Sequence, residues 1–192
     1  MTYICYLFKK LCLMITEIIK KVYEKKLERE ILAKRNLPKH IMVVADMNFV
    51  EHTLKKFLRW CEKFNVKEVT VCVKGNKKEV RSYFDGSILV NLIIGYNGKE
   101  EIADAVRSLA ELVEKGELNP EDVTEKDIEK FLKVKNSPDL IVRAGNVIPE
   151  FLIWQNIYSE LYFIDINWRN FRYIDFLRCL REYQRRERRY GR

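Results

Sequence analysis

The sequence predicts an α/β domain with a parallel central sheet flanked by helices, preceded by an N-terminal amphipathic helix. Short apolar runs alternate with helical patterns along most of the chain, as expected where crossover helices connect parallel strands. One of these runs, 41–45, is apolar at every position, which is typical of a strand buried on both faces. The chain has 192 residues, 47% of them hydrophobic, which is enough for one domain with its own core. We therefore expect residues 1–36 to form a helical extension and residues 37–192 to form the domain.

The first segment, Met1 to about Tyr23, has the spacing of an amphipathic helix. Its isoleucines and leucines share one broad face, and its lysines lie toward the other. Charged residues interrupt the segment, so no apolar run reaches the roughly 18 to 20 residues that a membrane-spanning helix requires. The charges follow the first apolar residues, unlike those of a cleaved signal. We expect a membrane surface or a partner protein to cover the apolar face, with packing against the chain's own domain as the alternative.

The remaining elements are assigned from their periodicity. Thr124 is placed to begin a helix as its N-cap, with Asp127 three residues on. Other helices are expected at 24–34, 54–64, 77–84, 101–115 and 151–157, with a basic helix at the end of the chain. Strands are expected at 41–45, 68–73, 88–94, 139–142 and 161–164.

The composition limits the partners. A net charge of +8 suits anionic partners such as a membrane face, a diphosphate-bearing substrate or nucleic acid. Arginines gather on the last helix, a pattern that is equally typical of a solvated helix face. Because the chain has no zinc-finger spacing and no aromatic RNA-binding motif, we expect no nucleic-acid partner.

The cysteines and histidines indicate neither a disulfide framework nor a metal site. The five cysteines are scattered and odd in number, which is typical of reduced thiols in a cytoplasmic protein. Cys61, Cys72 and Cys179 have apolar neighbours, so we expect them in the core. His40 and His52 lack partners at metal-ligand spacing, and we expect solvated or capping roles for both.

Polar and glycine residues follow several of the predicted strands. In an open parallel sheet, binding sites form beyond the carboxyl ends of the strands. Taken singly, each residue is explained equally well as part of a turn or a helix cap. The residues at these positions are Asp46, Lys74 with Gly75, Gly95 with Asn97, and Arg143 with Gly145.

Several segments resemble the cis-prenyltransferases, the undecaprenyl and dehydrodolichyl diphosphate synthases. They are Asp139-Leu140-Ile141-Val142-Arg143, Phe151-Leu152-Ile153-Trp154-Gln155, Tyr158-Ser159-Glu160-Leu161-Tyr162-Phe163 and Tyr183-Gln184-Arg185-Arg186-Glu187-Arg188-Arg189-Tyr190-Gly191. Earlier in the chain, Leu37-Pro38-Lys39-His40-Ile41 and, after the apolar run, Asp46-x-Asn48 resemble the first family motif. The resemblance implies the cis-prenyltransferase fold and the condensation of isopentenyl diphosphate with an allylic diphosphate to form polyprenyl diphosphate.

The resemblance also implies roles for individual residues. Asp46 corresponds to the aspartate that helps to hold Mg²⁺ on the allylic diphosphate, and Glu160 corresponds to a glutamate associated with the metal. Asn48 and Arg143 fall at substrate-binding positions. A metal and positioned cations suit this chemistry, because negative charge grows on the leaving diphosphate as its carbon–oxygen bond breaks.

The tail carries the family's Arg-x-Gly motif as Arg189-Tyr190-Gly191. In the family this tail crosses a dimer interface and completes the substrate site of the neighbouring subunit. The resemblance therefore implies that Arg189 and Gly191 act in trans. The guanidinium fork of arginine suits phosphate oxygens, and glycine permits close approach of the backbone.

The chain departs from the family pattern at three places. The family follows its aspartate with an arginine- and glycine-rich segment that binds diphosphate, whereas Met47 follows Asp46 here and a helix begins soon after. Lys74-Gly75-Asn76-Lys77 replaces a Ser/Thr-Glu-Asn-Trp signature, and residues 144–150 replace a Ser-Gly-Glu-x-Arg-x-Ser-Asn run that binds isopentenyl diphosphate. These differences predict that the chain cannot neutralise two diphosphates by itself.

We therefore expect an accessory subunit, non-catalytic or weakly catalytic, that resembles the Nogo-B-receptor-like subunits. It would pair with a catalytic cis-prenyltransferase subunit, which would hold most of the Mg²⁺, in the cytoplasm at the membrane surface. One alternative is a divergent homodimeric Mg²⁺-dependent polyprenyl diphosphate synthase that binds prenyl diphosphates itself. The other is a membrane-surface binding module that has kept only the fold.

Overall fold

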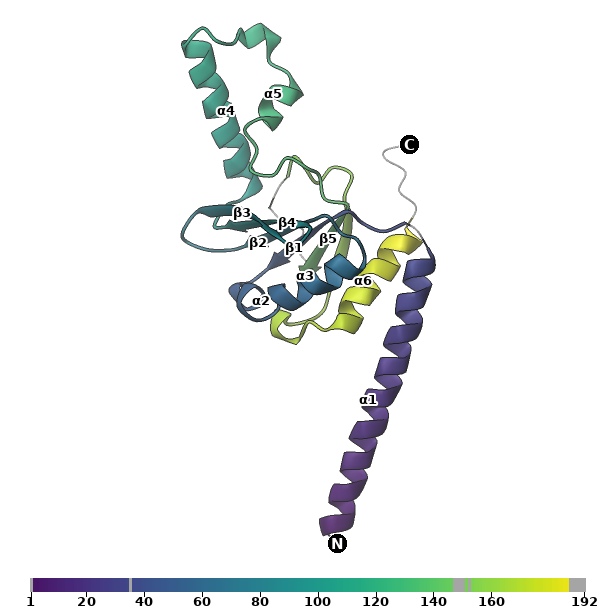
Figure 1. The fold of residues 1–192 in the computed structure, drawn as a ribbon. Coiled ribbons are helices and arrows are strands. Elements are labelled where there is room, and N and C mark those ends of the chain that lie inside the picture. The colour runs from purple at the N-terminus through teal and green to yellow at the C-terminus, as the bar shows by residue number, and fades with distance from the viewer. Residues whose placement is uncertain (1, 35, 147–150, 152, 187–192) are drawn as a thin grey trace.

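A six-stranded sheet forms the centre of the structure, a computed structural model that describes residues 2–34, 36–146, 151 and 153–186 (Figure 1). Its strands are β1 (His40–Ala45), β2 (Glu68–Val73), β3 (Glu79–Asp85), β4 (Ile88–Ile94), β5 (Leu140–Ala144) and β6 (Glu160–Ile164). They lie in the order β3-β4-β2-β1-β5-β6. All neighbours pair in parallel except β3, which runs antiparallel to β4. The predicted α/β class, with a mostly parallel sheet and an N-terminal helix, is confirmed.

Helices cover one face of the sheet and extend beyond it at two places. The helices are α1 (Thr2–Ala33), α2 (Met47–His52), α3 (Leu54–Lys63), α4 (Gly98–Glu114), α5 (Glu125–Glu129) and α6 (Tyr173–Arg185). Two short 3-10 helices are η1 (Pro120–Asp122) and η2 (Trp168–Asn170). Figure 1 shows α3 and α6 in front of the sheet, α4 and α5 projecting at one end, and α1 extending far beyond α6 toward the N-terminus. Among the described residues, no helix has a stretch long and apolar enough to cross a bilayer.

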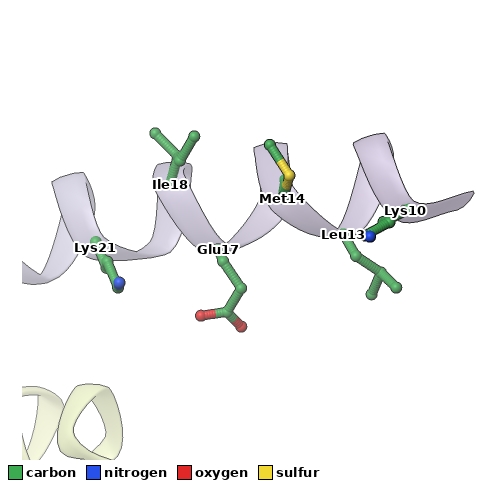
Figure 2. Close-up of a pocket in the computed structure, with 6 residues that line it drawn as sticks. All are labelled: Lys10, Leu13, Met14, Glu17, Ile18 and Lys21. Carbon is green, nitrogen blue, oxygen red and sulfur yellow. The ribbon is translucent and has the colours of Figure 1, made fainter. Parts of the chain in front are cut away.

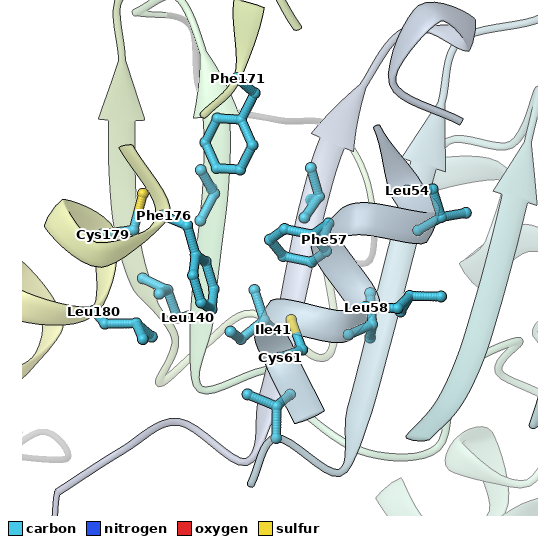
Figure 3. Close-up of a cluster of buried hydrophobic side chains, with 14 of the residues drawn as sticks. Ile41, Leu54, Phe57, Leu58, Cys61, Leu140, Phe171, Phe176, Cys179 and Leu180 are labelled. Atoms are coloured by element: carbon cyan, nitrogen blue, oxygen red, sulfur yellow. The ribbon is translucent and has the colours of Figure 1, made fainter. Parts of the chain in front are cut away.

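The main core lies between the sheet and the helices α1, α3 and α6. It includes Leu27 and Ile31 of α1, so the C-terminal end of the long helix is part of the domain. Figure 3 shows side chains of α3 and α6 meeting over the strands. Aromatic rings fill much of the space: Phe57 lies 5.3 Å from Phe176 and Phe49 lies 5.1 Å from Trp168, measured between ring centroids. The division at residue 36 stays a prediction.

The opposite face of the sheet carries a smaller apolar cluster. Its buried members are Met42, Val44, Cys72, Ile93, Val134, Ile141 and Phe151. Two of them, Val134 and Phe151, come from connections outside the helices and strands. Connecting segments therefore provide part of the cover on this face.

A row of polar side chains crosses the sheet near the amino ends of its parallel strands. Ser82 of β3 donates to Asn91 of β4 (2.7 Å), and Asn91 donates to Glu68 of β2 (2.7 Å). Thr70 of β2 forms a hydrogen bond of 2.8 Å with Nε2 of His40 on β1. His40 is only 3% exposed, so the expectation of a solvated or capping role for it was wrong, because its side chain points into this network. His52 is exposed.

Two expected helices were wrong. Residues 79–85 form β3 instead, which pairs with β4 through the two-residue turn Gly86-Ser87, where Gly86 has a φ of 59°. A Gly-Ser pair between β-prone residues is a hairpin signal, and it outweighs the weak helical pattern. Within 151–157, the described residues form turns, and Nδ2 of Asn156 donates to the carbonyl oxygen of Phe151 (2.8 Å). A side chain that bonds to the backbone in this way competes with helical hydrogen bonds.

Other local predictions are confirmed. Thr124 and Asp127 form the expected capping box at the start of α5. Cys61, Cys72 and Cys179 are buried, and burial raises the pKa of each thiol above its ordinary value. The short helix α2 was not expected from the sequence.

We expect Ile31→Ala and Ile19→Ala, one in each half of α1, to have different effects on the free energy of unfolding. Ile31 is 1% exposed and Ile19 is 63% exposed. Ile31→Ala should lower the free energy of unfolding by about 2–5 kcal/mol, because it leaves a cavity in the core. Ile19→Ala should change it by less than about 0.5 kcal/mol. Urea denaturation of both variants measures the difference, and equal losses would contradict the packing described here.

We expect the stability of the domain to fall as the pH decreases from about 6.5, the ordinary pKa of histidine. Burial lowers the pKa of His40, although Glu68 nearby opposes the shift. The folded chain thus binds a proton less readily than the unfolded chain, and protonation favours unfolding. Urea titrations at acidic and neutral pH should show a smaller change for His40→Gln than for the unmodified protein. If the free energy of unfolding depends on pH equally in His40→Gln and in the unmodified protein, groups other than His40 cause the pH dependence.

Candidate functional site

The carboxyl ends of the parallel strands meet at one edge of the sheet, and several residues singled out in the sequence gather there. Asp46 follows β1, and Arg143 lies near the end of β5, beside Val44 in the register of the two strands. Ile141 and Val44 belong to the smaller apolar cluster, and side chains alternate along a strand. Arg143 therefore lies over the same face of the sheet as that cluster, at the edge where Asp46 begins α2.

Asp46 is held by the backbone of the helix that it caps. Its Oδ1 accepts a hydrogen bond from the backbone N–H of Phe49 (3.2 Å), and its Oδ2 accepts one from the amide of Asn48 (3.3 Å). The residue is exposed. A carboxylate fixed in this way keeps lone pairs directed to solvent, where a cation could bind it.

Arg169 joins this group and was missed by the sequence analysis. Its Nε donates to Oδ1 of Asn48 (3.0 Å), across 121 positions of sequence. The contact depends on the packing of Trp168 of η2 against Phe49 of α2. No local motif marks Arg169, because only the tertiary fold brings η2 to α2. Asn48 thus connects Arg169 to the exposed carboxylate of Asp46 through two hydrogen bonds.

Arg143 is half-buried and incompletely paired. Within the part of the chain that the structure describes, its buried Nε has no hydrogen-bond acceptor. A buried guanidinium N–H without an acceptor is costly, and an anionic oxygen would satisfy it strongly. This geometry agrees with a substrate-binding role for Arg143.

Two lysines flank an aromatic ring at the end of β4. Nζ of Lys78 lies 5.3 Å and Nζ of Lys133 lies 5.4 Å from the ring centroid of Tyr96. The preceding Gly95 has a φ of 70°, and a Cβ there would lie 2.6 Å from the carbonyl oxygen of Lys77. Glycine is required at this position so that the turn after β2 can pack against β4. Glu100 pairs with Lys78 (3.3 Å), so the excess positive charge beside the ring comes from Lys133.

Behind Tyr96 lies a buried carboxyl group that the sequence analysis did not single out. Glu101 accepts hydrogen bonds from the backbone N–H of Lys133 (2.7 Å) and from the amide of Gln155 (3.3 Å). Burial raises the pKa of Glu101 above its ordinary value, and the hydrogen bonds oppose that shift. A cavity of about 10 Å³ beside it, lined partly by Tyr96 and Phe151, is too small for a substrate. Glu101 therefore connects α4 to the neighbouring segments.

Glu160 lies at the opposite edge of the sheet. It begins β6 and pairs with Leu140, the first residue of β5, whereas Asp46 follows the last residue of β1. Its carboxylate accepts a hydrogen bond from Nη1 of Arg186 (3.1 Å). Within one chain the structure does not bring Glu160 and Asp46 together, so they cannot share a metal ion there. Arg189 and Gly191 lie outside the described residues.

The residues at the Asp46 edge of the sheet could bind Mg²⁺ only if the substrate supplied further ligands to the ion. Among the described residues, no group of three or more His, Cys, Asp or Glu side chains could hold a metal. Mg²⁺ is commonly held by one or two carboxylates together with substrate phosphates. Asp46 could provide the single carboxylate of such a site.

Comparison with known proteins gives the family. A family model described as putative undecaprenyl diphosphate synthase matches residues 72–191, well over half of the chain. The chain belongs to this family, the cis-prenyltransferases. The match begins inside β2, so Asp46 and Asn48 lie before it, whereas Arg143 and Glu160 lie within it.

Archaeal and bacterial cis-prenyltransferases are similar to the chain. A tritrans,polycis-undecaprenyl-diphosphate synthase (geranylgeranyl-diphosphate specific) of Methanocaldococcus jannaschii is 46% identical over 131 residues, covering 65% of this chain and 46% of that protein. An isoprenyl transferase of Thermus thermophilus is 38% identical over 159 residues, covering 78% of this chain and 59% of that protein. The chain thus spans about half the length of these curated relatives.

Solved structures of the cis-prenyltransferase fold agree with the architecture. Lavandulyl diphosphate synthase from Lavandula x intermedia, crystallised with dimethylallyl diphosphate, superposes with a TM-score of 0.68 at 20% identity, covering 81% of this chain and 99% of that chain. A probable undecaprenyl diphosphate synthase from Campylobacter jejuni gives a TM-score of 0.62 at 21% identity, covering 82% of this chain and 100% of that chain. The fold implied by the sequence resemblance is therefore confirmed.

Substitution of Asp46 should separate its capping role from its charge. Asp46→Ala should lower the free energy of unfolding by about 1 kcal/mol, because the backbone N–H of Phe49 loses its acceptor. Asp46→Asn keeps an acceptor and should change it by only about a few tenths of a kcal/mol. Urea denaturation measures both values. Equal losses in the two variants would mean that the negative charge, and not the hydrogen bond, stabilises the start of α2.

Proposed function

We propose that this cis-prenyltransferase acts in the synthesis of polyprenyl diphosphate, by condensing isopentenyl diphosphate with an allylic diphosphate. The observation that supports this most directly is that Asp46 and Arg143, which correspond to family site residues, lie at the same edge of the sheet. Arg169 lies beside Asp46 through Asn48 (3.0 Å). A carboxylate and nearby guanidinium groups suit the binding of a metal-complexed diphosphate.

The chemistry needs this arrangement because the leaving diphosphate gains negative charge as the allylic carbon–oxygen bond breaks. The allylic carbon forms a bond to isopentenyl diphosphate, which then loses a proton. Mg²⁺, when bound, would neutralise phosphate oxygens. Asp46 would orient the metal-bearing diphosphate, and Arg143 and Arg169 would donate hydrogen bonds to its oxygens.

The names of the relatives favour a synthase over an accessory subunit. The proteins of M. jannaschii and T. thermophilus are named as a synthase and a transferase, and neither name refers to an accessory role. We therefore favour the hypothesis that this chain is a divergent homodimeric synthase that binds Mg²⁺ and prenyl diphosphates. The apolar side chains of Ile153, Ile157 and Phe163 are exposed near the edge strand β6, which supports pairing of the chain with another subunit.

The accessory subunit remains a second candidate because of the connection after Asp46. The chain passes from Asp46 directly into α2 and α3, and residues 47–53 contain no arginine or glycine that could bind a diphosphate. The tail also leaves the domain far from Asp46, since Arg186 contacts Glu160 and the carbonyl oxygen of Leu161 (2.6 Å) at the start of β6. This exit supports a role for Arg189 and Gly191 in the site of another chain.

Prenyl transfer measured on the purified chain separates the candidates. The assay would combine the chain, Mg²⁺, labelled isopentenyl diphosphate and geranylgeranyl diphosphate, the substrate in the name of the M. jannaschii relative. A synthase should incorporate label alone, and Asp46→Asn should lower the rate at least about tenfold without loss of stability. Chelation of Mg²⁺ should abolish incorporation.

An accessory subunit should be inactive alone and active after co-expression with a full-length family member of the same organism. Arg189→Ala should then lower the activity of the complex at least about tenfold. Arg192→Ala is the matched control, because Arg192 follows the Arg189-Tyr190-Gly191 motif without being part of it, and this variant should have little effect. If neither the chain nor the complex depends on Asp46 or Arg189, the proposal is wrong, and the membrane-surface module that kept only the fold becomes the better explanation.

A further inference from the structure

The N-terminal half of α1 carries an apolar face that nothing in the described structure covers. Its first half extends away from the rest of the molecule (Figure 1). Several large apolar side chains along it are about half to two-thirds exposed, namely Phe8, Leu11, Ile15, Ile18, Ile19 and Val22. Monomeric soluble proteins rarely expose contiguous apolar surface of this extent without a binding role.

Most of this face points away from the domain, although Ile18 and Val22 at its C-terminal end line a surface hollow together with Tyr173 of α6. At about 100° per residue, the six side chains from Phe8 to Val22 occupy a sector of about 100° on the helix. The side chains that pack against the core, Leu27 and Ile31, lie about 150° from the centre of that sector. The helix therefore cannot bury its apolar face by continuing along α6, and the surface that covers it comes from outside the domain.

The charges beside the apolar face identify the partner. Lys10 and Lys21 lie beyond one edge of the sector and Lys9 lies beyond the other, at about 110° to 130° from its centre. Lys20 lies on the far side of the helix, where its Nζ is 3.8 Å from the carboxylate of Glu17. Glu17 lies opposite the sector, where it would face water. Six lysines and two glutamates occupy residues 8–26. Figure 2 shows the same division, with Met14 and Ile18 on one side of the helix and Leu13 and Glu17 on the other.

A second copy of α1 fits this pattern poorly. Two identical helices packed on their apolar faces would bring two positively charged segments together, because lysines outnumber glutamates by six to two in each and Glu17 already pairs with Lys20 of its own helix (3.8 Å). Anionic lipid headgroups would instead neutralise the excess lysines while acyl chains cover the apolar side chains. The surface hollow of about 370 Å³ in Figure 2 is lined only by residues of α1, so it does not point to a small ligand.

We propose that the first half of α1 lies in the plane of an anionic membrane surface, with its apolar face among the lipids and its excess lysines at the headgroups. This inference does not depend on the proposed enzymatic function. It assigns to the helix a contact that the domain itself does not make. Because α1 is long, the domain would then lie beside the membrane-bound half of the helix, at the bilayer surface.

Vesicle co-sedimentation of the full chain tests the proposal. The chain should bind vesicles with about 30% phosphatidylglycerol at least about tenfold more tightly than neutral phosphatidylcholine vesicles. Ile15→Asn combined with Ile19→Asn should weaken that binding at least about tenfold. Leu13→Asn is the matched control, since Leu13 is 65% exposed on the opposite side of the same helix, and it should bind within about twofold of the unmodified chain.

Each outcome decides for or against the membrane. Equal binding to both vesicle types, or equal loss in the double variant and the Leu13 variant, would overturn the proposal. Light scattering of the same samples provides the test for a second copy: a dimer that the double variant dissociates, without vesicle binding by either protein, would assign the face to another α1. Circular dichroism of the variants verifies that α1 remains helical. Prenyl transfer with soluble substrates, measured in parallel, reports on the enzymatic proposal independently.

A fluorescent label provides a second measurement. Cys12 is exposed near the edge of the apolar face, whereas Cys61, Cys72 and Cys179 are buried. In a Cys5→Ser background, an environment-sensitive dye on Cys12 should shift its emission to the blue with anionic vesicles. An emission that is unchanged while the chain sediments with vesicles would place the contact elsewhere and overturn the proposal.

Discussion

The packing of aromatic side chains between α2, α3, η2 and α6 determines how the carboxyl edge of the sheet is built. Phe49 contacts the rings of Phe57 and Trp168 (5.5 and 5.1 Å between centroids). Because Phe49 also provides the N–H that Asp46 caps, the same residue anchors α2 to the core and fixes the Asp46 carboxylate. Trp168 brings Arg169 to Asn48. A functional group at this edge thus depends on contacts in the apolar core, and loss of core volume would displace charges as well as lower stability.

The two edges of the sheet differ in how their polar groups are satisfied. At the amino edge, neighbouring strands provide donors and acceptors for the network from Ser82 to His40, although the buried Nδ1 of His40 has no partner among the described residues. At the carboxyl edge, Asp46 is exposed and Arg143 has a buried N–H without an acceptor in the described part of the chain. Hydrogen bonds between strands fix their pairing, whereas exposed or incompletely satisfied charged groups are available to a ligand. The chemistry that we propose therefore falls at the edge where charged groups remain available.

Much of the fold could be predicted from the sequence, because its elements are local. Short runs rich in apolar residues mark the buried strands β1, β2 and β4, and helical spacing marks α3 and α4. The errors occurred where a local signal competed with another one. The turn at Gly86-Ser87 pairs a polar segment with β4 as β3, and the side chain of Asn156 bonds to the backbone of Phe151 in place of a helical hydrogen bond.

The site could be predicted only in part. Asp46 and Arg143 follow apolar runs, so their positions at strand ends are visible in the sequence. Arg169 and Glu101 are not visible in this way, because their roles arise from contacts with residues far away in the chain, at 121 and 54 positions respectively. Glu160 resembles a metal-associated residue, but its position at the first residue of β6 is set by strand register, which a motif does not specify.

The unbroken character of α1 has a mechanical consequence. The helix contains no glycine or proline over its 32 residues, so at 1.5 Å per residue it is a stiff rod of about 48 Å. One end of the rod is clamped to α6, where Gln184 donates to the carbonyl oxygen of Ile31 (2.9 Å). Because the helix has no hinge, a force on its free end would be transmitted to α6. A molecule bound to the free end would therefore fix the orientation of α6.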